Sequence, residues 1–275
     1  MARLAASRRR STDANLTPTM SQSNTFRKVR RELAKGWRKL LPDSAAAPAW
    51  PEDFSGDMIA LCRAVAPYTM TTRERVATLV RAVDYVVAEA IPGDFVECGV
   101  AAGGSSMAMA LALLAHNVSD RGLWLYDTFE GMPAPGEHDV GRYGTHAIHT
   151  YKKRRVDGKS TWINIPLETV QENMARTGYP AQRITYVKGK VEATLAERSP
   201  ERVALLRCDT DWYESTKAEL EVLWPRLSPG GIVLFDDYYR WQGSRKAADD
   251  YFKANGIRIF LSRIDAHAAV GVKQS

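Results

Sequence analysis

The sequence predicts an α/β domain built on a mostly parallel sheet that helices cover on both faces. From residue 52 onward, short apolar runs typical of buried strands alternate with longer segments of helical periodicity. A glycine-rich turn follows the first of these strands, and acidic residues follow several later ones. Ligands of open α/β sheets bind outside the carboxyl ends of the strands, so we expect a binding site at that edge.

The individual elements follow from these runs. We expect strands at 95–99, 123–127, 184–188, 203–208, 231–235 and 257–261. The helical segments among them are 57–66, 72–90, 105–116, 167–177, 215–226 and 242–255. No run of about 18 apolar residues occurs in the 275-residue chain, so the sequence predicts no membrane-spanning helix.

Positive charge is concentrated at the start of the chain. Residues 1–40 contain eleven Lys or Arg residues against Asp13 and Glu32, which gives this segment a charge of +9. Since the whole chain carries +6, the remaining 235 residues carry −3. The main body is therefore no nucleic-acid-binding surface, and the basic character belongs to an extension.

The extension divides into two parts ahead of the domain at 52–275. Residues 1–24 are rich in Arg, Ser, Thr and Asn, which predicts a disordered basic tail and also fits a transit peptide. In 25–51, apolar residues at helical spacing predict a basic amphipathic helix over 25–41, followed by a linker. Such a helix could dock on a membrane surface or a partner, or pack on the domain or across a homodimer.

The three cysteines indicate the redox compartment. Cys62, Cys98 and Cys208 share no metal-binding spacing, and the last two lie within apolar runs. Buried free thiols are typical of a reducing environment, so we expect a cytoplasmic protein.

The turn after the first strand is the clearest ligand-binding signal. The strand ends in Glu97, Gly99 and Gly103 allow close approach of a ligand to the backbone, and Ser105 can cap the next helix. A dinucleotide would require the spacing G-x-G-x-x-G, which is absent, and Glu97 would repel its phosphates. The acid suits the positive sulfonium and ammonium groups of S-adenosylmethionine (SAM).

Two later strand ends extend this predicted cofactor site. Asp127 ends the second strand, where an acid commonly holds ribose hydroxyls, although it could instead cap the following turn. Lys188 and Glu192 follow the strand at 184–188 and could line the adenine.

A second group of acids predicts a metal site. Asp209 follows the strand at 203–208, and Asp236 and Asp237 follow the strand at 231–235. If these strands are neighbours, the three carboxylates converge and repel one another unless protons or a cation intervene. Oxygen ligands of this kind select Mg²⁺ or a similar ion, although the same acids could simply cap turns and helices.

Two histidines lie in a polar insert at 134–165. His146 and His149 are spaced i, i+3. They are candidates for a general base or an acceptor-binding pair, and the alternative is an ordinary surface position.

Five stretches of the sequence resemble the macrocin O-methyltransferase family, which methylates sugar hydroxyls on macrolide and aminocoumarin antibiotics. They run in order over roughly residues 60–260: Tyr68–Arg75, Gly93–Val100, Tyr126–Pro133, Asp209–Thr216, and Ser228–Gly231 with Asp236–Tyr238. The resemblance implies a Rossmann-like class I methyltransferase with a seven-stranded sheet that depends on SAM and Mg²⁺.

The resemblance also implies roles for particular residues. It makes Asp209 a metal ligand and candidate base, and Asp236 and Asp237 the other metal ligands. It places Thr69, Met70 and Thr71 in a lid over the cofactor.

The resulting hypothesis is an O-methyltransferase that acts on a hydroxyl of a sugar or glycosylated natural product. Its expected partners are a small-molecule or glycan acceptor and a second copy of the chain, but no nucleic acid. A nicotinamide-dependent oxidoreductase of Rossmann type and a non-catalytic SAM-binding protein are the alternatives.

Overall fold

The structure is a computed structural model that describes residues 49–274. The tail expected at 1–24, the helix expected at 25–41 and most of the expected linker lie outside the described residues. Among residues 49–274, no helix is both long and apolar enough to cross a membrane.

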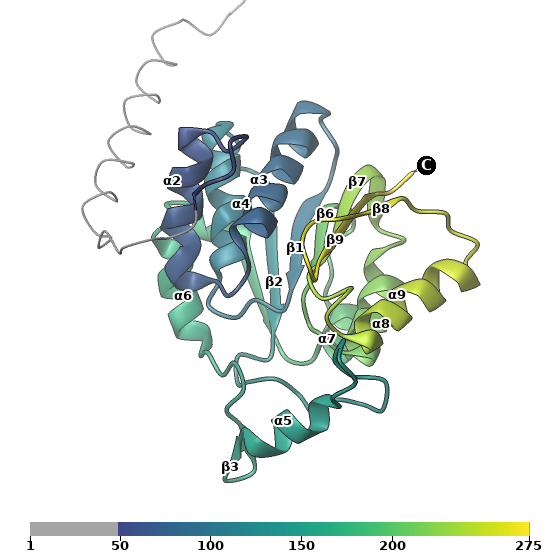
Figure 1. The fold of residues 1–275 in the computed structure, drawn as a ribbon. Helices are drawn as coiled ribbons and strands as arrows, with labels where there is room; N and C mark the ends of the chain where they lie inside the picture. Colours follow the sequence, from purple (N-terminus) through teal and green to yellow (C-terminus); the bar gives the residue numbers. More distant parts are fainter. Residues whose placement is uncertain (1–48, 275) are drawn as a thin grey trace, which may run out of the picture. The chain divides into compact units, whose positions relative to one another are not determined.

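A seven-stranded sheet forms the centre of the domain (Figure 1). Its strands are β1 (Asp94–Cys98), β2 (Leu123–Asp127), β5 (Ile184–Lys188), β6 (Val203–Cys208), β7 (Leu227–Phe235), β8 (Leu261–Arg263) and β9 (Ala269–Val272). They lie in the order β5-β2-β1-β6-β7-β9-β8. The first five in this order are parallel, while β9 and β8 are antiparallel to their neighbours. The predicted α/β fold with a mostly parallel sheet is confirmed.

Helices cover both faces of this sheet. One layer contains α2 (Gly56–Val65), α3 (Arg73–Ala88), α4 (Gly104–Ala115) and α6 (Leu167–Ala175), and the other contains α7 (Val191–Glu197), α8 (Tyr213–Leu223) and α9 (Gln242–Ala254). Alternate strand residues feed two cores: Phe95 packs with the first layer, and its neighbour Val96 packs with the second. This alternation is the period of two that a strand imposes on its side chains.

The end of the chain differs from the prediction. The strand expected at 257–261 is wrong: β8 begins at Leu261, and β9 follows after a loop. Ile257 and Ile259 pack against the second core without joining the sheet, so their alternating pattern reflects burial rather than strand pairing. The four-residue strand β9 pairs with β7 and was not predicted.

The insert at 134–165 has structure of its own. It contains α5 (Ala147–Lys153) and a two-stranded hairpin formed by β3 (Arg155–Val156) and β4 (Lys159–Ser160). Figure 1 shows α5 and β3 beyond the edge of the sheet, below α7 and α8 in that view. The insert therefore borders the carboxyl ends of the strands.

Gly99 fixes how closely β1 approaches the end of β6. Its φ is +87°, and a Cβ atom there would collide with the backbone oxygen of Asp209. Because L side chains rarely adopt this conformation and the opposing atom is backbone, no other residue fits without a shift of the strand ends.

We predict that Gly99→Ala lowers the free energy of unfolding by about 3 kcal/mol, since it adds a steric clash to backbone strain. Gly178→Ala is the matched control, because Gly178 also has a positive φ (+73°) but faces open space. The control should cost only about 1 kcal/mol. Urea denaturation measures both values, and equal losses would contradict the proposed collision.

Candidate active site

A cavity of about 650 Å³ opens at the carboxyl ends of the parallel strands. Residues after β1, β2, β5, β6 and β7 all line it. The site residues expected from sequence that reach it are Thr69, Met70, Thr71, Gly99, Ser105, Asp127, Glu192, Asp209, Asp236 and Asp237. One cavity therefore contains both the glycine-rich turn and the acids after the later strands.

Asp127 holds the glycine-rich turn in shape. One of its carboxylate oxygens accepts hydrogen bonds from the backbone N–H groups of Val100 (2.7 Å) and Ala101 (3.2 Å). The other oxygen accepts from the N–H of Phe129 (2.9 Å). Ala101 has a φ of +48°, an unusual conformation for a residue with a side chain. The acid therefore stabilises a turn that lines the cavity, in addition to facing the cavity itself.

Three residues expected in the cofactor site do not line the cavity. Gly103 is the left-handed N-cap of α4, and Lys188 extends toward Glu130, 4.0 Å away. Glu97 is fully enclosed: one oxygen accepts from Arg207 (2.7 Å) and the other from Ser106. Burial raises the pKa of Glu97, although the charge of Arg207 opposes this shift. Its carboxylate faces a protein cation rather than the cavity.

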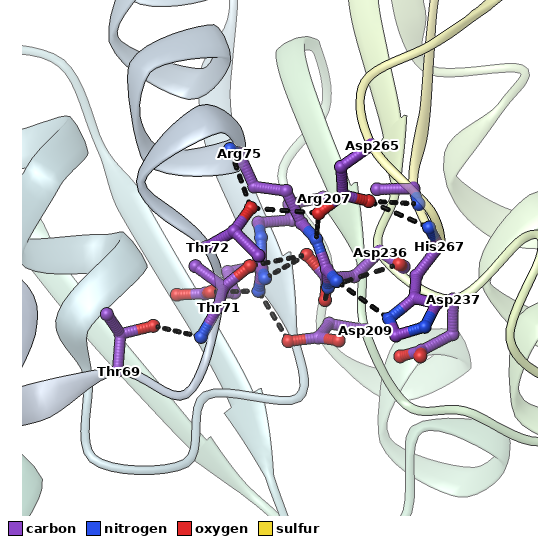
Figure 2. A network of polar contacts seen from close by, with 12 residues as sticks. Thr69, Thr71, Thr72, Arg75, Arg207, Asp209, Asp236, Asp237, Asp265 and His267 are labelled. Atoms are coloured by element: carbon purple, nitrogen blue, oxygen red, sulfur yellow. Dashed lines mark hydrogen bonds and ion pairs between the residues drawn. The ribbon is translucent and has the colours of Figure 1, made fainter. Parts of the chain in front are cut away.

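The segment expected to form a lid connects the two ends of the cavity. Met70 is 71% exposed, whereas the hydroxyl of Thr71 lies 3.4 Å from Asp236 and that of Thr72 lies 2.8 Å from Asp265. A Cβ on Gly104 would lie 2.6 Å from the Thr69 side chain, so this segment packs directly on the start of α4. Figure 2 shows Thr71 and Thr72 beside Asp236 and Asp265, with Thr69 farther from these acids.

The acids after β6 and β7 converge as the sequence predicts. These strands are parallel neighbours with Cys208 opposite Phe235, so Asp209 and Asp236 leave the sheet at the same level. The closest group of carboxylates, however, is Asp209, Asp211 and Asp237, which each offer one oxygen within 4.8 Å of the others. Asp211 thus joins the group in the place expected for Asp236.

Asp236 forms ion pairs with two arginines (Figure 2). Its carboxylate accepts from Nη2 of Arg207 at 2.5 Å and from Nη1 of Arg75. Burial alone would raise the pKa of Asp236, but the charges of Arg207 and Arg75 outweigh it and lower the pKa. Asp236 is therefore an ionised structural partner of the two arginines.

The three converging acids have the opposite electrostatics. Burial raises the pKa of Asp209 and of Asp237 well above the ordinary value for aspartate, and their acidic neighbours add to the shift, although the charge of Arg207 opposes it at Asp209. Burial likewise raises the pKa of Asp211 to about 7. Crowded carboxylates of this kind bind protons or a cation. Three oxygen ligands facing one cavity fit a hard divalent ion such as Mg²⁺.

Several site residues were not predicted from the sequence. Arg75, Arg207, Asp211 and His267 all line the cavity. Nη2 of Arg75 donates to Nδ1 of His267 (3.0 Å), and burial, together with the Arg75 charge, lowers the pKa of that histidine. An arginine inside the apolar run Val203–Cys208 was the one available signal, because a buried charge requires a partner.

The two histidines of the insert lie elsewhere. Neither His146 nor His149 lines the cavity. His146 caps α5, where Nδ1 accepts from the N–H of Ile148 (3.2 Å), and its ring centroid is 6.4 Å from that of His149. The structure therefore gives His146 a capping role and brings neither ring to the acids.

A cluster of three tryptophans forms the wall of the cavity near the acids. Trp212 packs edge to face against Trp162 and Trp241, whose ring centroids lie 5.6 and 5.1 Å from its own. Trp162 and Trp241 face the cavity. Indole rings in the lining of the cavity provide an apolar surface for a ring-shaped acceptor.

A family comparison identifies this arrangement. The family model of macrocin-O-methyltransferase (TylF) matches residues 20–272. The chain belongs to this family. The match includes residues 25–41, so it extends beyond the stretches that carry the resemblance in the sequence.

Named relatives agree with the assignment. The chain is 38% identical over 198 residues to the 8-demethyl-8-(2,3-dimethoxy-alpha-L-rhamnosyl)-tetracenomycin-C 4'-O-methyltransferase of Streptomyces olivaceus, covering 72% of each protein. It is 32% identical over 198 residues to the demethyldecarbamoylnovobiocin O-methyltransferase of Streptomyces niveus, again covering 72% of each. The protein is therefore an O-methyltransferase, and the nicotinamide-dependent alternative is excluded.

Solved structures support the fold assignment. The O-methyltransferase NovP superposes with a TM-score of 0.68 at 27% identity, covering 92% of this chain and 99% of NovP. The calicheamicin methyltransferase CalS11 superposes with a TM-score of 0.57 at 18% identity, covering 96% of this chain and 99% of CalS11. The expected Rossmann-like class I methyltransferase fold is confirmed.

The ion pair of Asp265 with Arg75 predicts a loss of stability in acid. Arg75 Nε lies 2.7 Å from Asp265, and the pKa of Asp265 is lowered to about 2 because the hydrogen bonds from Arg75 and the backbone outweigh burial. A lowered folded-state pKa means that the stabilisation is complete above the unfolded-state value of about 3.9 and is lost as the pH falls toward 2.

We therefore expect the wild type to lose about 2 kcal/mol more than Asp265→Asn when the pH is lowered from 5 to 2. The exposed Asp157→Asn is the control and should follow the wild type. Urea denaturation at each pH measures the difference, and parallel pH profiles for Asp265→Asn and the wild type would contradict the ion-pair effect.

Proposed function

We propose that the protein transfers the methyl group of SAM to a hydroxyl of a sugar or glycosylated small molecule, with the help of a divalent cation. The main observation behind this proposal is that Asp209, Asp211 and Asp237 converge in the same cavity as the glycine-rich turn. The names of the relatives, which give a rhamnosyl tetracenomycin and demethyldecarbamoylnovobiocin as acceptors, support a glycosylated acceptor.

The donor fits the end of the cavity formed by the turn. The backbone of Gly99–Ala101 lines this end without large side chains, and Asp127 and Glu192 supply the acids. We assign Asp127 to the ribose side and Gly189–Glu192 to the adenine side, as the strand order of the sheet favours. Thr69–Thr71 would cover the donor, and Glu97 would act through Arg207 rather than by direct contact.

The other end of the cavity fits a cation and an acceptor. Asp209, Asp211 and Asp237 would hold the cation, which supplies positive charge that lowers the pKa of an acceptor hydroxyl. Trp162 and Trp241 would position the sugar ring beside these acids. Holding two substrates in this way converts an encounter in solution into a reaction between oriented groups.

The transfer itself then needs a proton acceptor. The hydroxyl oxygen forms a bond to the methyl carbon while the carbon–sulfur bond of SAM breaks and its electron pair stays on sulfur. The hydroxyl proton passes to a carboxylate of the acid group, for which Asp209 and Asp211 are the candidates because both line the cavity and are partly exposed, whereas Asp237 is buried. Burial and the charge of Arg75 lower the pKa of His267, which also lines the cavity.

Two expectations from the sequence stay predictions. They are a homodimer and a contact of 25–41 with a membrane surface or a partner. The cytoplasmic location is a further proposal, which the buried free thiols of Cys62, Cys98 and Cys208 support.

Substitution of Asp237 and of Asp236 distinguishes the two candidate sets of metal ligands. One set is Asp209, Asp211 and Asp237, and the other, expected from the sequence, contains Asp236 instead of Asp211. We predict that Asp237→Asn weakens Mg²⁺ binding by at least about tenfold and removes methyl transfer, since one of three oxygen ligands is lost. SAM binding should stay near the wild-type level because the donor end is intact. Isothermal titration with Mg²⁺ and with SAM measures both, and activity that is insensitive to chelator would refute the metal role.

Asp236→Asn should act mainly on stability. Loss of this carboxylate leaves Arg75 and Arg207 without a shared buried partner, which we expect to cost about 3 kcal/mol of unfolding free energy. The Mg²⁺ affinity of the folded variant should change much less than that of Asp237→Asn. Asp250→Asn, on the exposed face of α9, serves as the control for both. If Asp236→Asn lost Mg²⁺ while keeping its stability, Asp236 would be the ligand instead of Asp211.

A further inference from the structure

A second, smaller cavity of about 240 Å³ lies next to the acceptor end and has no role in the proposed reaction. Three arginines from separate segments line it: Arg142 from the insert, Arg245 from α9 and Arg263 from β8. Tyr238, Tyr239 and Trp241 form its aromatic wall. The cavity therefore combines several cationic groups with flat aromatic faces.

The positive charge of this cavity is largely uncompensated. Asp249 is the one carboxylate paired there within the described chain: it lies 3.3 Å from Nε of Arg245 and also accepts from the hydroxyl of Tyr238. Arg142 and Arg263 form no ion pair with a described carboxylate, and their side chains make only long hydrogen bonds of 3.3–3.4 Å, to backbone oxygens of Asp265 and Ala266. Both side chains keep hydrogen-bond donors for another partner.

The aromatic wall holds the guanidinium groups in place. The Arg263 guanidinium lies 3.4 Å from the ring centroid of Tyr239, and that of Arg245 lies 5.4 Å from the centroid of Tyr238. A guanidinium stacked on a ring keeps its edge free to donate two parallel hydrogen bonds to an oxyanion. Since pockets for drug-sized ligands measure about 300–1,000 Å³, this cavity suits a smaller group such as phosphate or diphosphate.

The cavity is connected to the acceptor end through shared residues. Trp241 lines both cavities, and Arg240, which lines the larger one, accepts a hydrogen bond at its backbone oxygen from the N–H of Arg142 (2.8 Å). Trp241 is therefore a wall that the two cavities share. The donor end lies on the far side of the acids, at the turn after β1.

We propose that the second cavity binds a phosphate-class oxyanion carried by the acceptor, so that the methylated sugar is a phosphate- or diphosphate-linked sugar. This inference rests on the proposed function, because it extends the acceptor site of that reaction. The sugar lies against the tryptophans near Asp209, and its anionic group passes Trp241 to reach the arginines. A neutral glycoside would leave Arg142 and Arg263 without an anionic partner.

Binding of an inorganic probe tests the cavity independently of the reaction. We expect sodium pyrophosphate to bind the wild type and to bind the double variant Arg142→Gln/Arg263→Gln about tenfold or more weakly, because two charge-assisted contacts are lost. Arg258→Gln removes an equally exposed arginine of the same C-terminal region outside the cavity and should bind as the wild type does. Isothermal titration measures all three proteins.

A conservative variant distinguishes a loss of the binding contact from a loss of folding. Arg263→Lys keeps the charge but loses the fork-shaped donor group, so its affinity should lie between those of the wild type and the double variant. Circular dichroism checks that each variant is folded. Absence of pyrophosphate binding by the wild type, or equal affinity in the wild type and the double variant, would overturn the proposed oxyanion site.

A second titration identifies the source of the oxyanion. In the presence of S-adenosylhomocysteine, a panel of nucleoside-diphosphate hexoses is compared with the matching methyl hexosides. The proposal requires tighter binding of the charged sugars and loss of this preference in Arg142→Gln/Arg263→Gln. Equal binding of both sugar classes, with pyrophosphate still bound, would mean that a free ion rather than the acceptor occupies the cavity. Titration with SAM alone tests the proposed function separately, because that site does not include the arginines.

Discussion

The buried guanidinium of Arg207 is the interaction on which the active site depends. It contacts Glu97 at the end of β1 (2.7 Å), Asp209 after β6 (2.6 Å) and Asp236 after β7 (2.5 Å). The three acids come from adjacent strands, so one cation sets the relative positions of the strand ends that line the cavity. Because a buried charge without partners is strongly unfavourable, the acids and the arginine stabilise one another only as a complete set.

Arg75 extends this network to the opposite side of the cavity. It lies in the first turn of α3, the helix that follows the segment Thr69–Thr72, and pairs with both Asp236 and Asp265. The lid segment is therefore anchored to the same carboxylate that Arg207 holds. A movement of this segment over the donor has to preserve or replace these contacts, which couples closure at the donor end to the geometry of the acids.

Much of this fold and part of this site were predictable from local patterns. Apolar runs located β1, β2, β5, β6 and β7, because strands buried on both faces leave a continuous signal. Their order also brought Asp209 and Asp237 together, since parallel neighbours end at one edge. The roles of Asp236 and Glu97 were not predictable, because they depend on which acid the two arginines reach. That choice is made by side-chain packing across α3, β1, β6 and β7 and has no local sequence pattern.

The backbone shows that the acid group is held against opposing forces. Asp211 has a φ of +72°, and Ile163 and Ala101, which also line the cavity, have φ values of +51° and +48°. Residues with side chains persist in this region only where the surrounding structure compensates for the strain. At Asp211 the strained conformation also brings a carboxylate close to two others, in a buried position where burial first, and the charge of Asp209 second, raise its pKa. A packing requirement alone would favour an asparagine or glycine there, so the combination of strain and charge repulsion at one residue points to selection for a ligand or a proton at this position.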